Sequence, residues 1–207
     1  MAQKKHLEKI EQLFQKSLVV SFSDLDRIVK NRKQSNYTKQ LVHYLVKRGK
    51  IKRIGKGCYT AVEELGVSVL CFKPAYLGLQ SALSFHGLWE QETIPVIITA
   101  NSIKSGARMC MGANILIRRC ARKYLFGYSY EDDGGYYLPY SDIEKTLIDF
   151  FVFRVPVSRE VLANFERKIN RRKLDKYLSA YPQRIRIKVK NALANNVIGS
   201  SVITTNK

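Results

Sequence analysis

The segment LVHYLVKRGKIKRIGKGCYTA, residues 41–61, places closely spaced cations beside turn-forming glycines. Lys and Arg side chains on one surface bind the phosphates of a nucleic acid and release its counterions, so the affinity depends strongly on salt. Such contacts position a protein on DNA without reading the base sequence. The residues predicted to make them are Lys39, Lys47, Lys52, Arg53 and Lys56.

Base recognition needs polar side chains that reach into a groove, and the same part of the chain supplies them. On a helix that begins near residue 36, Asn36, Gln40 and His43 face away from the apolar side. Asn and Gln amides can pair bidentately with adenine in the major groove. We therefore expect these three side chains to read bases, with Lys39 and Lys47 beside them on the same face.

The charge of the chain also favours a polyanionic partner. Its 207 residues carry a formal net charge of +19, with a pI of about 9.9. The charge is +11 over residues 1–61, −2 over 62–150 and +10 over 151–207. Runs of Lys and Arg are most often solvated helix faces, but two basic regions around a near-neutral middle are typical of a nucleic-acid-binding protein.

Hydrophobic periodicity predicts the elements that position these side chains. It indicates a helix over residues 3–16 and a second over 24–31, which Ser23 would cap. Gly49 would end a third helix, and a two-stranded hairpin with a twist or bulge would follow over residues 51–61. The predicted apolar stripe of the third helix consists of Tyr37, Leu41, Tyr44 and Leu45.

Three helices followed by a basic hairpin is the order of a winged helix-turn-helix, whose third helix enters the major groove. After residue 61 the short β-branched and aromatic runs VSVLCF, IPVIITA, ANILIRR and YYLPY predict strands, with one helix, LQSALSFHGLW, among them. SDIEKTLIDFF suggests a capping box of Ser141 and Glu144. Residues 184–190 fit both a strand and a helix, and we favour the helix. The predicted fold class is α+β, with a winged helix-turn-helix domain over 1–61 and an α/β domain over 62–207 that ends in helices.

The rest of the chain offers little chemistry. Ser81, Ser84 and His86 are the strongest catalytic candidates, but Ser84 and His86 would face different sides of a helix. The four cysteines form no zinc-binding pattern, so reduced, buried thiols are expected. We predict a non-enzymatic protein without metal or cofactor, and a cytoplasmic one, since the sequence shows no signal peptide or membrane-spanning run.

The C-terminal cations form a second candidate nucleic-acid surface. They could extend a DNA footprint, bind RNA or bind an acidic protein, and a solvated helical face is equally consistent with them. The residues considered for this role are Arg167, Arg171, Arg172, Lys173, Arg186 and Lys190.

Three segments carry a resemblance to a known family. PAYLGLQSALSFHGLWEQETIPVIITAN, residues 74–101, resembles the part of AbiE-type (AbiEi) antitoxins in which a SAL helix, a Gly-Leu pair and a strand ending in Thr follow one another. SDIEKTLIDFF is similar to a later helix of that family, and LVKRGKIKRIGKGCYTA to its wing. The resemblance spans residues 35–195. The long N-terminal helix and the basic C-terminal region depart from the family pattern.

The resemblance implies an antitoxin that represses its own operon by binding inverted repeats in the promoter. Its N-terminal domain would bind double-stranded DNA, and its C-terminal domain would counteract a nucleotidyltransferase-like toxin, not always through a stable complex. We expect a monomer or weak dimer, with two copies on the operator, and no membrane partner. The alternatives are a stand-alone winged-helix transcription factor and an RNA-binding protein that uses the basic C-terminal helices.

Overall fold

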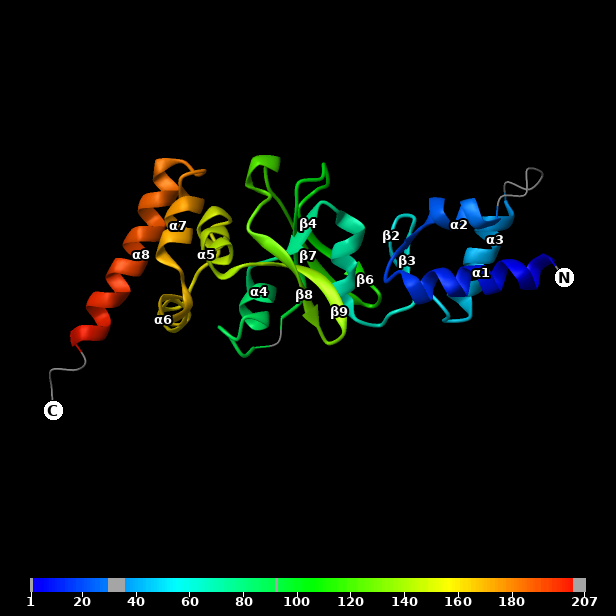
Figure 1. Cartoon of the computed structure of the whole chain (residues 1–207), viewed down its shortest axis with the longest axis horizontal. Helices are drawn as coiled ribbons and strands as arrows, with labels where there is room; N and C mark the ends of the chain where they lie inside the picture. The colour runs from blue at the N-terminus through cyan, green and yellow to red at the C-terminus, as the bar shows by residue number, and fades with distance from the viewer. Residues whose placement is uncertain (1, 30–35, 92, 203–207) are drawn as a thin grey trace.

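The computed structural model describes residues 2–29, 36–91 and 93–202, and it shows a mixed α+β fold (Figure 1). An N-terminal group of helices with a small sheet, a central mixed sheet and a C-terminal group of helices follow one another along the long axis of the molecule. Among the described residues, no helix is long and apolar enough to cross a membrane.

The N-terminal region packs three helices around a small apolar core. That core includes Ile10, Leu25, Leu41 and Leu45, each at most 3% exposed. The elements are α1 (Ala2–Lys16), β1 (Val20–Ser21), α2 (Phe22–Val29), α3 (Tyr37–Lys47), β2 (Lys52–Gly55) and β3 (Cys58–Thr60).

Two predicted details of these helices are wrong. The residue that caps α2 is Ser21 rather than Ser23, because the Ser21 hydroxyl accepts from the Asp24 amide while the Asp24 carboxylate accepts from the Ser21 amide and hydroxyl. Tyr44 does not belong to the buried stripe of α3: its side chain is 44% exposed, with the Arg48 guanidinium 5.5 Å above the ring. Thr38 is buried instead, and its hydroxyl donates to Asp26 at 2.7 Å.

The hairpin forms as predicted and joins a three-stranded sheet in the order β1-β3-β2. Its register shifts between Arg53 and Gly55, which is the expected bulge. Gly49 ends α3 with a φ of 69°, and Gly57 turns the hairpin with the same φ. A positive φ is costly for residues with a side chain, so glycine is the natural residue at both places.

The central sheet has six strands in the order β6-β7-β5-β4-β9-β8. Strand β5 runs parallel to β7 and antiparallel to β4, and β4 runs parallel to β9. The strands are β4 (Ala75–Leu77), β5 (Val96–Thr99), β6 (Gly106–Cys110), β7 (Ala113–Arg119), β8 (Tyr128–Asp133) and β9 (Tyr136–Ser141).

Alternation along the strands divides the core between the two faces of the sheet. Tyr76 and Ile98 face the C-terminal helices, and their neighbours Leu77 and Ile97 pack on the other face. That second face is covered by the 3-10 helix η1 (Leu65–Phe72). The VSVLCF run was predicted as a strand, and that prediction is wrong: burial on several sides favours apolar residues in any backbone conformation.

Four helices follow the sheet, and α4 (Gln80–Phe85) lies between β4 and β5. The predicted Ser141–Glu144 capping box is wrong, since Asp142 caps α5 by accepting from the Lys145 amide, while Glu144 accepts from the Asn170 amide. The helical interpretation of residues 184–190 is confirmed. The C-terminal helices are α5 (Ile143–Val152), α6 (Arg159–Lys168), α7 (Arg171–Leu178) and α8 (Gln183–Val202).

Candidate nucleic-acid interface

Helix α3 presents a continuous polar face to solvent. Thr38, Leu41, Val42 and Leu45 bury the opposite side of the helix against α2 and the hairpin. Positions three, four and seven residues apart lie along one side of a helix, so the remaining polar residues form one stripe. All of its members are exposed: Asn36, Lys39, Gln40, His43 and Lys47.

The side chains of this stripe make no hydrogen bond or ion pair with any part of the chain that the structure describes. Asn36 occupies the position that caps α3, yet its amide forms no capping bond. The amide is therefore available to an outside partner. Lys50, three residues after the end of α3, does have an internal partner. Its ammonium lies 2.6 Å from the Glu11 carboxylate, and this contact raises the pKa of the lysine.

The three hairpin cations differ in whether their charged groups are bound by other residues of the chain. The Lys52 ammonium lies 2.7 Å from Glu63, and this hydrogen bond lowers the pKa of the Glu63 carboxyl. The Arg53 side chain is exposed and uses its Nε to donate to the Gly55 carbonyl, which leaves the two terminal nitrogens open. Lys56, at the turn, is exposed, and its side chain makes no hydrogen bond or ion pair with the described residues.

All the charged residues in the stretch of sequence that contains α3 and the hairpin are Lys or Arg. Residues 27–62 hold eleven Lys and Arg residues and no Asp or Glu. The carboxylates of Asp24 and Asp26 come just before that run, and both are occupied by hydrogen bonds within the N-terminal region. An anion that approaches α3 therefore meets cations with no carboxylate close to them in the sequence, whereas Glu11 beside Lys50 and Glu63 beside Lys52 oppose it in part near the hairpin.

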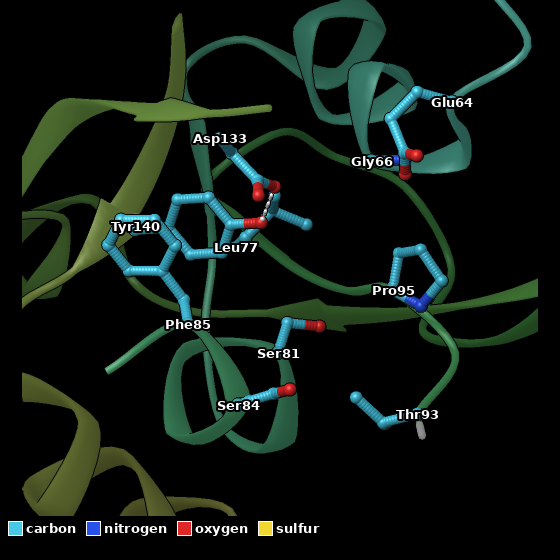
Figure 2. Close-up of a pocket in the computed structure, with 10 residues that line it drawn as sticks. All are labelled: Glu64, Gly66, Leu77, Ser81, Ser84, Phe85, Thr93, Pro95, Asp133 and Tyr140. Carbon is cyan, nitrogen blue, oxygen red and sulfur yellow. Dashed lines mark hydrogen bonds between the residues drawn. The ribbon is translucent and has the colours of Figure 1, made fainter. Parts of the chain in front are cut away.

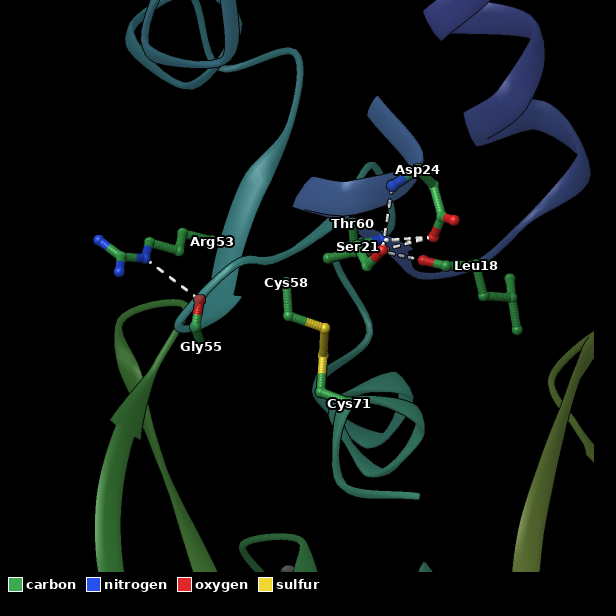
Figure 3. Close-up of a disulfide and its surroundings, with 8 residues drawn as sticks. All are labelled: Leu18, Ser21, Asp24, Arg53, Gly55, Cys58, Thr60 and Cys71. Carbon is green, nitrogen blue, oxygen red and sulfur yellow. Dashed lines mark hydrogen bonds between the residues drawn. A yellow bond between two sulfur atoms is a disulfide. The ribbon is translucent and has the colours of Figure 1, made fainter. Parts of the chain in front are cut away.

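A disulfide links the hairpin to a segment outside it (Figure 3). Cys58 of β3 bonds to Cys71 of η1, so the hairpin is covalently tied to the central region. The prediction that all cysteines are reduced is therefore wrong for this pair, whereas Cys110 and Cys120 are free. Sequence reasoning missed the bond because the two residues follow no disulfide spacing pattern and meet only through tertiary packing.

The C-terminal candidates are mostly engaged within the protein. Lys173 lies 3.0 Å from Asp142 and 3.1 Å from Glu144, and these contacts outweigh the opposing effect of burial and raise the pKa of the lysine. Arg171 pairs with Glu166, Lys190 with Asp175, and Arg186 donates to two carbonyls at the end of α7. Arg167 and Arg172 are the members of that set without a described partner.

An open cleft of about 760 Å³ lies between η1, α4 and the β8–β9 hairpin (Figure 2). Its polar residues include Glu64 and Asp133, so its charge disfavours phosphate. The Tyr140 hydroxyl donates to Asp133 at 2.6 Å, and burial with this bond raises the pKa of the phenol, which keeps its proton. Ser81 and Ser84 also line the cleft.

The catalytic candidates of the sequence do not come together as a reactive pair. The Ser81 hydroxyl accepts from the Val96 amide at 2.8 Å, which makes it a structural link between α4 and β5. The His86 ring is bonded through Nε2 to the Ser141 carbonyl oxygen at 2.7 Å. Ser84 has no base among the described residues in contact with it, and an unassisted serine is a poor nucleophile.

A buried ionic cluster lies between α5 and the central sheet, and sequence reasoning missed it. Lys145 pairs with Asp149 one helical turn later, with side chains only 1% and 2% exposed. The Tyr76 hydroxyl donates to Asp149 at 2.8 Å, and the ammonium lies within 6 Å of three aromatic rings, among them Tyr76 and Tyr181. Burial raises the pKa of Asp149, and Lys145 opposes that shift. This cluster holds α5 to the sheet.

Among the described residues, no group of three or more His, Cys, Asp or Glu side chains is placed to hold a metal ion.

The Lys145–Asp149 spacing of four residues was the available sequence signal for the buried cluster, because it places the two side chains on one side of a helix. The same spacing is common on solvated helices, so it does not by itself indicate burial.

No family model matches the chain, and no curated protein matches it. A solved structure with a similar fold is that of the RV2827C protein from Mycobacterium tuberculosis. The two share 13% sequence identity with a TM-score of 0.59, over 90% of this chain and 75% of that one. At this identity the likeness concerns the arrangement of helices and strands alone.

Proposed function

We propose that the chain is a DNA-binding protein whose N-terminal region is a winged helix-turn-helix domain, with α3 in the major groove and the β2–β3 hairpin as the wing. The observation that carries this proposal is the polar stripe of α3. It is exposed, makes no hydrogen bond or ion pair with the described residues, and is bordered in the sequence by an acid-free run of cations. The order of three helices and the hairpin, with its β1-β3-β2 sheet, fits that type of domain.

The division of labour within the interface follows from side-chain chemistry. Asn36, Gln40 and His43 have donors and acceptors that can pair with base edges, whereas Lys39 and Lys47 hold charges suited to phosphates. Arg53 and Lys56 extend the phosphate contacts along the hairpin. Lys52 belongs to the same surface, but Glu63 neutralises it in the free protein.

The resemblance to AbiE-type antitoxins extends the proposal from DNA binding to a biological role. The chain would repress its own operon through inverted repeats and counteract a nucleotidyltransferase-like toxin encoded beside it. The domain boundary at residue 61 belongs to the same proposal, with the antitoxin function assigned to residues 62–207. The rival RNA-binding role gains little support, since four of the six C-terminal cations considered for it are held by internal contacts.

Fluorescence anisotropy tests the proposal with the duplex upstream of the protein's own gene, a scrambled duplex of equal length and an RNA hairpin. We expect the promoter duplex to bind tightest and to keep its lead at about 200 mM salt, because base contacts are less sensitive to salt than phosphate contacts. Equal binding to both duplexes that disappears with salt would contradict the repressor role. Tighter binding to the RNA hairpin would favour the rival.

A further inference from the structure

The hairpin does not project freely from the N-terminal region. Ile54 of β2 is 4% exposed and belongs to the same apolar cluster as Ile115 and Ile117 of the central sheet. Parts of β2 and of the edge strand β6 come within 8 Å of each other, measured between Cα atoms. In Figure 3 the tip of the hairpin at Gly55 lies next to a strand of that sheet.

The near-neutral charge of the central region conceals an uneven distribution along the chain. Residues 93–130 hold six Lys and Arg residues and no Asp or Glu. Strand β6, at the sheet edge beside the hairpin, belongs to this segment. Two acid-free basic segments, 27–62 and 93–130, therefore meet where the hairpin packs on the sheet.

Strand register places Arg108 on the face that the hairpin covers. Arg108 lies directly opposite Ile115 in the antiparallel β6–β7 pair. Directly opposite residues in such a pair project from the same face, and Ile115 packs with Ile54 on that face. Arg108 is exposed, and its guanidinium donates to the Lys104 carbonyl at 2.8 Å, which turns the side chain toward the exposed Lys104.

We propose that the DNA-contacting surface continues from the hairpin onto strand β6, where Arg108 and Lys104 bind phosphates beside those bound by Arg53 and Lys56. We also infer that the Cys58–Cys71 disulfide holds the hairpin in place beside β6, because it ties β3 to η1 on the same side of the central sheet. Duplex DNA carries one charge per about 1.7 Å of its axis, so cations on the hairpin and on β6 can each meet a phosphate of their own. This inference rests on the proposed DNA-binding function.

The test measures binding of the full chain to a mixed-sequence duplex across a salt series, since phosphate contacts form on any sequence. Arg108→Ala is compared with Arg159→Ala, which removes an exposed arginine without a described partner from α6, in the C-terminal group of helices. Removal of one phosphate contact makes the slope of log K against log salt shallower by about 0.9. We expect that change for Arg108→Ala and none for Arg159→Ala.

The role of the disulfide is tested by making Arg108→Ala again in a Cys71→Ser background. Treatment of the wild type with dithiothreitol is a second route, in which the disulfide gains two electrons and two protons as the reagent forms its own cyclic disulfide. In both cases we expect the wild-type slope to become shallower, and Arg108→Ala to add no further change. An undiminished effect of Arg108→Ala without the disulfide would show that the bond does not hold the surface together.

A Lys47→Ala variant separates this inference from the proposed function. If Lys47→Ala weakens binding while Arg108→Ala behaves like Arg159→Ala, the extended surface is wrong and the α3 interface stands. If neither Lys47→Ala nor Arg108→Ala changes the slope, both proposals are wrong. Circular dichroism of each variant establishes that it is folded before its slope is compared.

Discussion

Glu63 restrains one of the hairpin cations, so we expect its replacement by a neutral residue to increase the affinity for DNA. The Glu63 side chain is 85% exposed and touches the Lys52 ammonium at 2.7 Å. In the Glu63→Gln variant the carboxylate charge is gone, and Lys52 is free to contact a phosphate. Exposed ion pairs contribute little to stability, so the fold is expected to be unaffected.

The size of the effect follows from counterion release. One added phosphate contact makes the slope of log K against log salt steeper by about 0.9, so a rise from about 50 mM to about 200 mM salt costs the variant about 3.5-fold more affinity than the wild type. Glu63→Gln should therefore bind DNA more tightly than the wild type at low salt. Its advantage should shrink by that factor as the salt rises.

Glu90→Gln is the matched control, because Glu90 is an exposed acid without a described partner and its loss changes the net charge equally. Fluorescence anisotropy over the salt series gives the slopes of the wild type and both variants. Equal slopes for Glu63→Gln and Glu90→Gln would refute the reasoning, since the gain would then be a general charge effect rather than a contact made by Lys52.

Three further results are expected from the rest of the structure. Asp149→Leu should lower the free energy of unfolding in urea by about 3–5 kcal/mol because it leaves Lys145 buried without its partner, and Lys145→Met combined with it should cost less than that. Burial and the hydrogen bond to Asp142 raise the pKa of Tyr177 to about 12. An unfolded phenol loses its proton near pH 10, so the free energy of unfolding should fall as the pH rises from about 10 to 12, and less so in Tyr177→Phe. Thiol titration of the denatured protein should find two free thiols before reduction and four after it, because one disulfide binds two of the four cysteines.

Local signals in the sequence were sufficient to predict the elements that form the proposed interface. Gly49 and Gly57 mark a helix end and a turn because their backbone conformations disfavour other residues. In α8 the choice between strand and helix was settled by Val189 and Leu193, which are buried one turn apart. The exposed positions of α3 followed from the same periodicity, although Tyr44 and Thr38 exchanged the roles expected from hydrophobicity.

The features that sequence reasoning missed depend on contacts between distant segments. The Cys58–Cys71 bond and the packing of Ile54 on the central sheet both arise where the hairpin meets η1 and β6. Lys145 was missed because a buried lysine contradicts the usual distribution of charges and is stable only with Asp149 beside it. These contacts connect the regions on either side of residue 61, which no local pattern records.

The central claim is that α3 reads DNA bases with Gln40 while Lys47 binds phosphate, and two single variants test it most directly. Binding of Gln40→Ala and Lys47→Ala to the promoter duplex and to a scrambled duplex is measured at one salt concentration. We predict that Gln40→Ala loses about 1–3 kcal/mol on the promoter duplex alone, whereas Lys47→Ala weakens both duplexes by the same factor. If Gln40→Ala left the preference for the promoter unchanged, α3 would not be the element that reads the sequence.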